Sequence, residues 1–269
     1  MSDPIKHHIV PQCYLRRFSV DKISVKYFDK SLKELKEEKI DNICYINDFY
    51  TLTQSDPYFI ETTFFANNIE DKLARILTHF ENIDFNLSTV NYDKTLRHNL
   101  AKQIVLQYMR TPIYRDARSL YELNLHYDRI KNILRKINFE VENIEFIPSN
   151  KAEYHKTILL ENINDVISII EKANWELIYT SLKEFYTSDN PITIKTSGND
   201  YIEYYDAIKK FKEIFYPLNS HLLLHINNHQ SMSFKTISIR NTNDLEIDNI
   251  NTLIKNNAVQ YVIYKDIFK

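Results

Sequence analysis

Trp175-Glu176-Leu177-Ile178-Tyr179-Thr180 marks the point where the sequence changes from a helical to a strand-like pattern. Short segments rich in β-branched and aromatic residues follow, and turn-forming residues separate them, which is typical of strands. Segments with this pattern are 175–180, 184–188, 192–195, 214–217, 222–226, 235–240 and 259–264, with a helix predicted at 245–257. We therefore expect a C-terminal, mostly antiparallel sheet.

The residues before this point are mainly helical. In 63–81, apolar residues recur at helical spacing and form one stripe that includes Phe65, Ile69, Leu73, Ile76, Leu77 and Phe80. Further helices are predicted at 94–110, 115–137 and 151–173, and Pro112 should end or kink the first of these three. Strands are predicted at 24–28 and 44–52, and the charge run 34–39 is expected to be a solvated turn or helix end. The predicted fold is α+β, with a helical middle region between a short N-terminal β element and the C-terminal sheet.

The composition sets limits on the class of protein. A chain of 269 residues can form one integrated domain, 1–269, and the best candidate for an internal boundary is 143–150. The single glycine excludes Gly-rich phosphate loops. Two cysteines are too few for a disulfide framework and fit structural thiols in a reducing cytoplasm. No apolar run approaches the roughly 18 residues of a membrane span, so no membrane partner is expected.

Basic residues are concentrated in the segment 94–136, although the net charge of the whole chain is only −2. Such a segment on helices is typical of a surface that binds a polyanion, here a nucleic acid or a nucleotide. It can equally pair with the acidic remainder of the chain.

Two motifs combine reactive polar side chains with a proline. The first is Lys6-His7-His8-Ile9-Val10-Pro11-Gln12-Cys13-Tyr14-Leu15-Arg16-Arg17-Phe18, and the second is Tyr186-Thr187-Ser188-Asp189-Asn190-Pro191. With Arg110-Thr111-Pro112, Trp175 and Tyr216-Pro217-Leu218, they make the chain resemble the bacterial family called domain of unknown function 4238 (DUF4238). The resemblance spans nearly the whole chain, but it implies no particular reaction.

Adjacent His7 and His8 on an extended segment should point to opposite sides, so at most one of them faces a given site. Histidine titrates near neutrality and acts as an acid, a base or a metal ligand. On the helix 94–110, Gln103, Gln107 and Arg110 share one face. This polar face can line a ligand pocket, or it can meet carboxylates of the preceding helix such as Glu70.

Ser188, Asp189 and Asn190 stand before Pro191, where Asp and Asn commonly build a structural turn. The same residues could instead present a carboxylate and an amide from a rigid strand end. Both readings remain open at the level of sequence.

We hypothesise that these residues form a single cleft in an enzyme acting on nucleic acid or nucleotide phosphate, a hydrolase or nuclease. In this hypothesis the catalytic candidates are His7 or His8, Glu70 and Asp189, and the substrate-binding candidates are Gln103, Gln107, Arg110, Ser188 and Asn190. A divalent ion such as magnesium or manganese could take part, held by an imidazole or a carboxylate. The alternative is a non-catalytic module that binds a nucleotide or a protein. A toxin or phage-defence effector is compatible with either.

Overall fold

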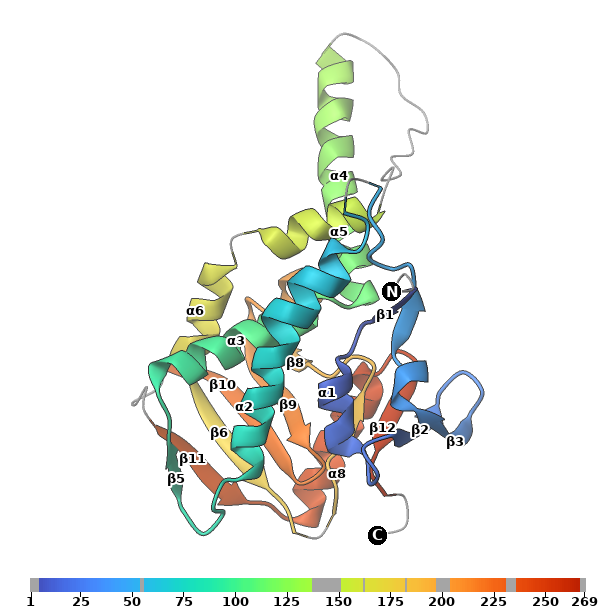
Figure 1. The fold of residues 1–269 in the computed structure, drawn as a ribbon. Coiled ribbons are helices and arrows are strands. Elements are labelled where there is room, and N and C mark those ends of the chain that lie inside the picture. Colours follow the sequence, from blue (N-terminus) through green and yellow to red (C-terminus); the bar gives the residue numbers. More distant parts are fainter. Residues whose placement is uncertain are drawn as a thin grey trace.

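The computed structural model describes residues 5–53, 56–136, 151–161, 163–181, 183–196, 204–230 and 236–266. Within these ranges the chain forms an α+β fold in which helices cover both faces of a large sheet (Figure 1). A smaller sheet stands beside it, built from two N-terminal strands, one C-terminal strand and the short strand at residues 187–188. The predicted fold class is therefore confirmed, whereas the boundary considered at 143–150 lies outside the described residues.

The large sheet has the strand order β5-β11-β6-β10-β9-β8. All neighbouring strands in it pair antiparallel except β6 and β11, which are parallel. Its strands are β5 (Thr89–Asn91), β6 (Ala173–Tyr179), β8 (Thr193–Thr196), β9 (Phe211–Asn219), β10 (Leu222–Gln230) and β11 (Thr236–Asn241). The predicted C-terminal, mostly antiparallel sheet is thus present.

The small sheet has the order β3-β2-β12-β7, and two further strands, β1 and β4, form a separate antiparallel pair. Strand β3, at the edge of the small sheet, is the charge run 34–39. This run was expected to be a solvated turn or helix end, so that expectation was wrong. A strand in which five of the six residues are Glu or Lys suits the edge of a sheet, because charged side chains there discourage pairing with other chains. The bounds are β1 (Lys6–His8), β2 (Ser24–Asp29), β3 (Glu34–Lys39), β4 (Tyr45–Asn47), β7 (Thr187–Ser188) and β12 (Tyr261–Tyr264).

The helices pack on the two faces of the large sheet. Neighbouring residues of β6 point to opposite faces, so Leu177 joins the main core beneath α2 and α3, while Ile178 joins a smaller cluster against α8. Figure 1 shows α2 and α3 in front of the sheet and α4 projecting from the body. The helices are α1 (Gln12–Leu15), α2 (Asp71–Glu81), α3 (Lys94–Met109), α4 (Pro112–Lys136), α5 (Lys151–Leu160), α6 (Asn164–Lys172), α7 (Tyr204–Ala207) and α8 (Asp244–Asn257). No helix within the described ranges has the length and apolarity that a membrane span requires.

Helix α3 agrees with the helix predicted at 94–110, and it is separated from α4 at Pro112 as expected. The Asp93 side chain caps it by accepting the Leu96 N–H at 2.6 Å. Pro112 then begins α4, because the first turn of a helix needs no N–H from its opening residue. The helix predicted at 151–173 is instead two helices, α5 and α6.

The first predicted helix contains two kinds of helix. Residues Ile60–Glu70 form a π-helical segment, and α2 continues from it without a break. A π-helix has about 4.4 residues per turn because its hydrogen bonds span five residues, against 3.6 in an α-helix. Positions 61 and 70 therefore lie on one side of the segment, whereas an α-helix would put them on opposite sides.

Candidate acid–base site

A polar pocket of about 280 Å³ lies between the N-terminal motif and the helical segment opposite it. Strand β1 and helix α1 supply one wall, and the π-helical segment with the start of α2 supplies the other. We call it the N-terminal pocket; its polar lining comprises His8, Gln12, Arg16, Glu61, Glu70 and Asp71.

Three side chains at four-residue spacing form the first wall. The Arg16 guanidinium donates to Gln12 Oε1 at 2.9 Å, which turns the amide nitrogen of Gln12 toward His8 Nε2, 3.4 Å away. In this orientation the Gln12 amide donates and His8 Nε2 accepts. We therefore assign His8 as a neutral ring whose proton is on Nδ1.

Two glutamates stand on the second wall because the π-helical turn brings them to one side. Glu61 Oε1 accepts the backbone N–H of His8 at 3.4 Å. Its other oxygen, Oε2, is buried and has no hydrogen-bond partner within the described residues. Glu70 forms an ion pair with Arg110 at 3.1 Å.

Arg110 lies behind the pocket with only 1% of its surface exposed. Its guanidinium covers the Phe65 ring at 3.9 Å from the ring centroid and donates to both Glu70 and the His8 carbonyl. Tyr50 donates in turn to the Arg110 carbonyl at 2.8 Å. Arg110 therefore joins the end of α3 to both walls of the pocket.

Burial moves the pKa values of the two titratable groups in opposite directions. Burial and, to a lesser degree, the charge of Arg110 lower the pKa of His8 below 6.5. Burial raises the pKa of Glu61 to about 7, despite the opposing effect of Arg110. Near neutral pH the pocket thus holds an uncharged imidazole beside a carboxyl group that keeps its proton about half of the time.

Cys13 also lines the pocket, but burial raises the pKa of its thiol to about 12. The thiolate is the nucleophilic form of cysteine, so this environment favours a structural thiol.

Gln103 and Gln107 are buried and bond to backbone carbonyls. Gln103 donates to the Ile69 carbonyl at 3.0 Å, and Gln107 donates to the Ile9 carbonyl at 3.0 Å. The polar face of α3 therefore holds the two walls of the pocket in position, while its side chains do not line the pocket.

His7 points away from the pocket. Its Nδ1 accepts the backbone N–H of Tyr50 at 2.8 Å, and its ring stacks on the Tyr50 ring at 5.6 Å between centroids. The ring is fully buried. Of the two histidines, only His8 lines the N-terminal pocket.

The second motif, residues 186–191, forms hydrogen bonds with the backbone at the start of β12. Asp189 accepts three backbone N–H groups, those of residues 259, 260 and 261, at 2.8 to 3.2 Å. The Ser188 hydroxyl accepts the Asn190 N–H at 3.1 Å, and the Asn190 amide donates to the Asn257 carbonyl at 3.2 Å. These three side chains do not line the N-terminal pocket.

The basic segment 94–136 has internal partners along part of its length. Arg97 is buried over the Trp175 ring and donates to the Glu171 carbonyl at 2.7 Å. Arg118 pairs with Glu122 at 2.8 Å. Exposed cations remain toward the end of α4, at Arg129, Arg135 and Lys136.

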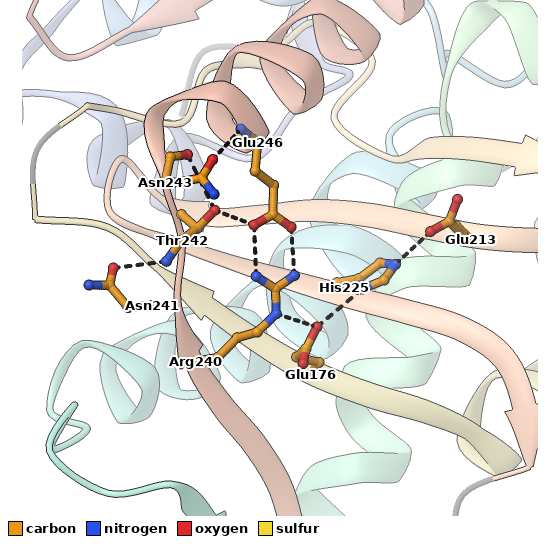
Figure 2. Close-up of polar contacts among 8 residues, drawn as sticks. All are labelled: Glu176, Glu213, His225, Arg240, Asn241, Thr242, Asn243 and Glu246. Atoms are coloured by element: carbon orange, nitrogen blue, oxygen red, sulfur yellow. Dashed lines mark hydrogen bonds and ion pairs between the residues drawn. The ribbon is translucent and has the colours of Figure 1, made fainter.

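A second polar cluster, which the sequence analysis missed, crosses the large sheet (Figure 2). His225 on β10 stands between Glu213 of β9 at 3.2 Å and Glu176 of β6 at 3.5 Å. Arg240 on β11 contacts Glu176 at 3.0 Å and holds Glu246 of α8 by two hydrogen bonds. We call this the cross-sheet network; its members are Lys195, Glu213, His225, Glu176, Arg240 and Glu246.

Sequence reasoning also missed Gln12, Arg16 and Glu61. The four-residue spacing of Gln12 and Arg16 was a usable signal, because it places two side chains on one face of a helical turn, whereas His8 precedes the helix on β1. In the described part of the chain, no group of three or more His, Cys, Asp or Glu side chains is placed to hold a metal ion.

Comparison with known proteins identifies a family and nothing beyond it. Residues 6–267 match the family described as "Protein of unknown function (DUF4238)". No curated protein and no solved structure matches the chain.

Proposed function

We propose that this chain, which belongs to the DUF4238 family, is a nuclease-like enzyme that cleaves RNA by general acid–base catalysis in the N-terminal pocket. One observation carries the proposal: a neutral imidazole and a carboxyl group with a pKa of about 7 line the same pocket. Such a pair supplies a base and an acid in the same pH range.

In the proposed reaction, His8 Nε2 removes the proton of a ribose 2′-hydroxyl, and that oxygen attacks the adjacent phosphorus. The bond from phosphorus to the 5′-oxygen breaks while Glu61 gives its proton to the leaving oxygen. The products are a 2′,3′-cyclic phosphate and a free 5′-hydroxyl. Arg16, exposed at the rim of the pocket, provides positive charge for the non-bridging phosphate oxygens.

A second groove, on an adjacent face of α2, supports a polyanionic substrate. It measures about 360 Å³, and its lining includes the exposed side chains Lys72, Arg75 and His79 of α2 together with Asp93, which caps α3. Two cations, Lys72 and Arg75, on one side of the helix suit the neighbouring phosphates of a strand. An RNA-cleaving activity would suit a cytoplasmic toxin or phage-defence effector.

The proposal assigns no proton transfer to His7, Asp189, Ser188 or Asn190, because their side chains have backbone or core partners away from the pocket. Glu70 and Arg110 act as a positioning pair, since Arg110 donates to the backbone of His8. No step requires magnesium or manganese.

The test is cleavage of a fluorescent oligoribonucleotide, with DNA of the same sequence as the comparison and with EDTA or magnesium in parallel. We expect RNA to be cut to a cyclic phosphate and DNA to remain intact. His8→Ala and Glu61→Gln should each reduce the rate about 100-fold or more, whereas Glu246→Gln, outside the pocket, should retain it. Circular dichroism melts confirm that each variant is folded.

The pH profile separates the two roles. The rate should rise through the lowered pKa of His8, where the base becomes neutral, and fall above about pH 7, where Glu61 loses its proton. In Glu61→Gln the residual rate should not fall above pH 7. Equal cleavage of DNA, or no RNA cleavage under any condition, overturns the proposal, and binding without turnover would favour a recognition module.

A further inference from the structure

A second cavity, of about 460 Å³, lies on the outer face of the small sheet, beside the end of α8. It falls within the range of small-molecule sites. Five of its eight lining side chains are aromatic or aliphatic: Phe28, Leu35, Tyr186, Val262 and Tyr264. The register of the sheet explains the apolar floor, because Phe28 of β2 is paired with both Leu35 of β3 and Val262 of β12.

Two lysines line the cavity, and no carboxylate lines it among the described residues. Lys30 is fixed, since its ammonium donates to the carbonyls of Lys255 and Ala258 at the end of α8. The Lys255 ammonium lies 5.0 Å from the centre of the Tyr186 ring. Positive charge therefore stands directly beside an aromatic surface.

A polar group without a partner lies in the same wall. Tyr264 is only 6% exposed, and its hydroxyl is buried with no hydrogen-bond partner within the described part of the chain. A buried hydroxyl without a hydrogen-bond partner destabilises the folded protein. A ligand that offers an acceptor to this hydroxyl would remove that destabilisation.

We propose that this cavity binds a small planar aromatic anion. The ring lies against Phe28 and Tyr186, the anionic group faces Lys255 and Lys30, and an acceptor atom bonds to the Tyr264 hydroxyl. The anionic group is a phosphate, as in a nucleotide, or a carboxylate, as in an aromatic acid. The cavity is distinct from the N-terminal pocket, because the two share no lining residue.

The test is isothermal calorimetry on the full chain with two matched pairs of probes: adenosine monophosphate with adenosine, and indole-3-acetate with indole-3-acetamide. At least one anion should bind with a sub-millimolar Kd, at least tenfold more tightly than its neutral partner. Binding of the nucleotide alone identifies the phosphate source, and binding of the acid alone identifies the carboxylate source.

Two substitutions test whether the probes bind in this cavity. Lys255→Gln should weaken the anion about tenfold and leave the neutral probe unchanged. Tyr264→Phe should weaken binding without lowering the melting temperature, because the hydroxyl has no protein partner to lose. The same titrations with His8→Ala should be unaffected, which separates this cavity from the N-terminal pocket. No binding by any probe at 5 mM, or binding that both variants leave unchanged, overturns the proposal.

Discussion

The N-terminal pocket and the cross-sheet network contain similar side chains, but their charges are balanced in different ways. In the network each carboxylate meets a cation or an imidazole (Figure 2), and the pKa values of Glu176 and Glu246 are lowered, chiefly by hydrogen bonds from His225 and Arg240 respectively. In the pocket, burial raises the pKa of Glu61, and one of its oxygens has no partner. A carboxylate with a lowered pKa stabilises the folded protein at neutral pH. A carboxyl group with a raised pKa destabilises it there, but it can exchange a proton near neutral pH, as a catalytic group must.

Removing Arg110 should have the largest effect on stability. Arg110→Ala leaves Glu70 without its cation and the His8 carbonyl without its donor, and breaking a buried pair in this way costs about 3–5 kcal/mol. Urea unfolding measures the loss. Arg110→Lys, the matched control, should lose less because it keeps the charge. A loss below about 1 kcal/mol in Arg110→Ala would show that the residue does not hold the two walls together.

Glu61→Gln should stabilise the protein, and increasingly so as the pH rises. Its pKa is raised in the folded state from 4.5 to about 7, so the folded protein binds the proton more tightly than the unfolded chain. The stability of the wild-type protein therefore falls as the pH rises from about 4.5 through about 7. At pH 8 the variant should be more stable by up to about 3 kcal/mol, since one pKa unit corresponds to about 1.4 kcal/mol. At pH 4.5 the two should be nearly equal. A wild-type protein that gains stability relative to the variant between pH 5 and 8 would contradict the buried acid.

Glu246→Gln should have the smallest effect, and the opposite sign. Its pKa is lowered, mainly by Arg240, so its contribution is present at neutral pH and is lost as the pH falls through its folded-state value. The side chain is about one third exposed, and such ion pairs contribute up to about 1 kcal/mol. Unfolding in 0.1 M and 1 M salt should show that the difference from wild type shrinks at high salt. A salt-independent loss of several kcal/mol would place this network in the same class as Arg110.

Local pattern predicted the elements whose periodicity is regular. The 3.6-residue pattern gave α3 and most of α4, and short β-rich segments gave β6, β9 and β10. The pattern failed for 44–52, which was predicted to be one strand. Cys44 and Asp48 adopt positive φ angles on either side of β4 and limit that strand to three residues. It also failed for β3, because a strand at the edge of a sheet lacks the buried alternation that identifies strands.

The candidate site was less predictable than the fold. Nine residues were expected to share one cleft. His8, Glu70 and Arg110 meet around the N-terminal pocket. The other six do not line it: His7, Gln103, Gln107, Ser188, Asp189 and Asn190. Glu61 was missed because the predicted helix began only at residue 63, whereas the π-helical segment begins at Ile60. Even in an α-helix extended back to position 61, a period of 3.6 residues would place Glu61 opposite Glu70. The cross-sheet network could not be predicted either, since it depends on which strands become neighbours in the sheet.

The π-helical segment makes the proposed chemistry depend on chain length as well as on residue identity. A one-residue deletion between positions 61 and 70 that let an ordinary α-helix form would leave eight residue steps of about 100° each, so the two carboxylates would lie about 80° apart around the helix axis instead of on one side. The apolar contacts of α2 and the fold could survive such a deletion, while Glu61 would leave the pocket. The π-helical winding of residues Ile60–Glu70 therefore sets the angle between the two glutamates around the helix axis.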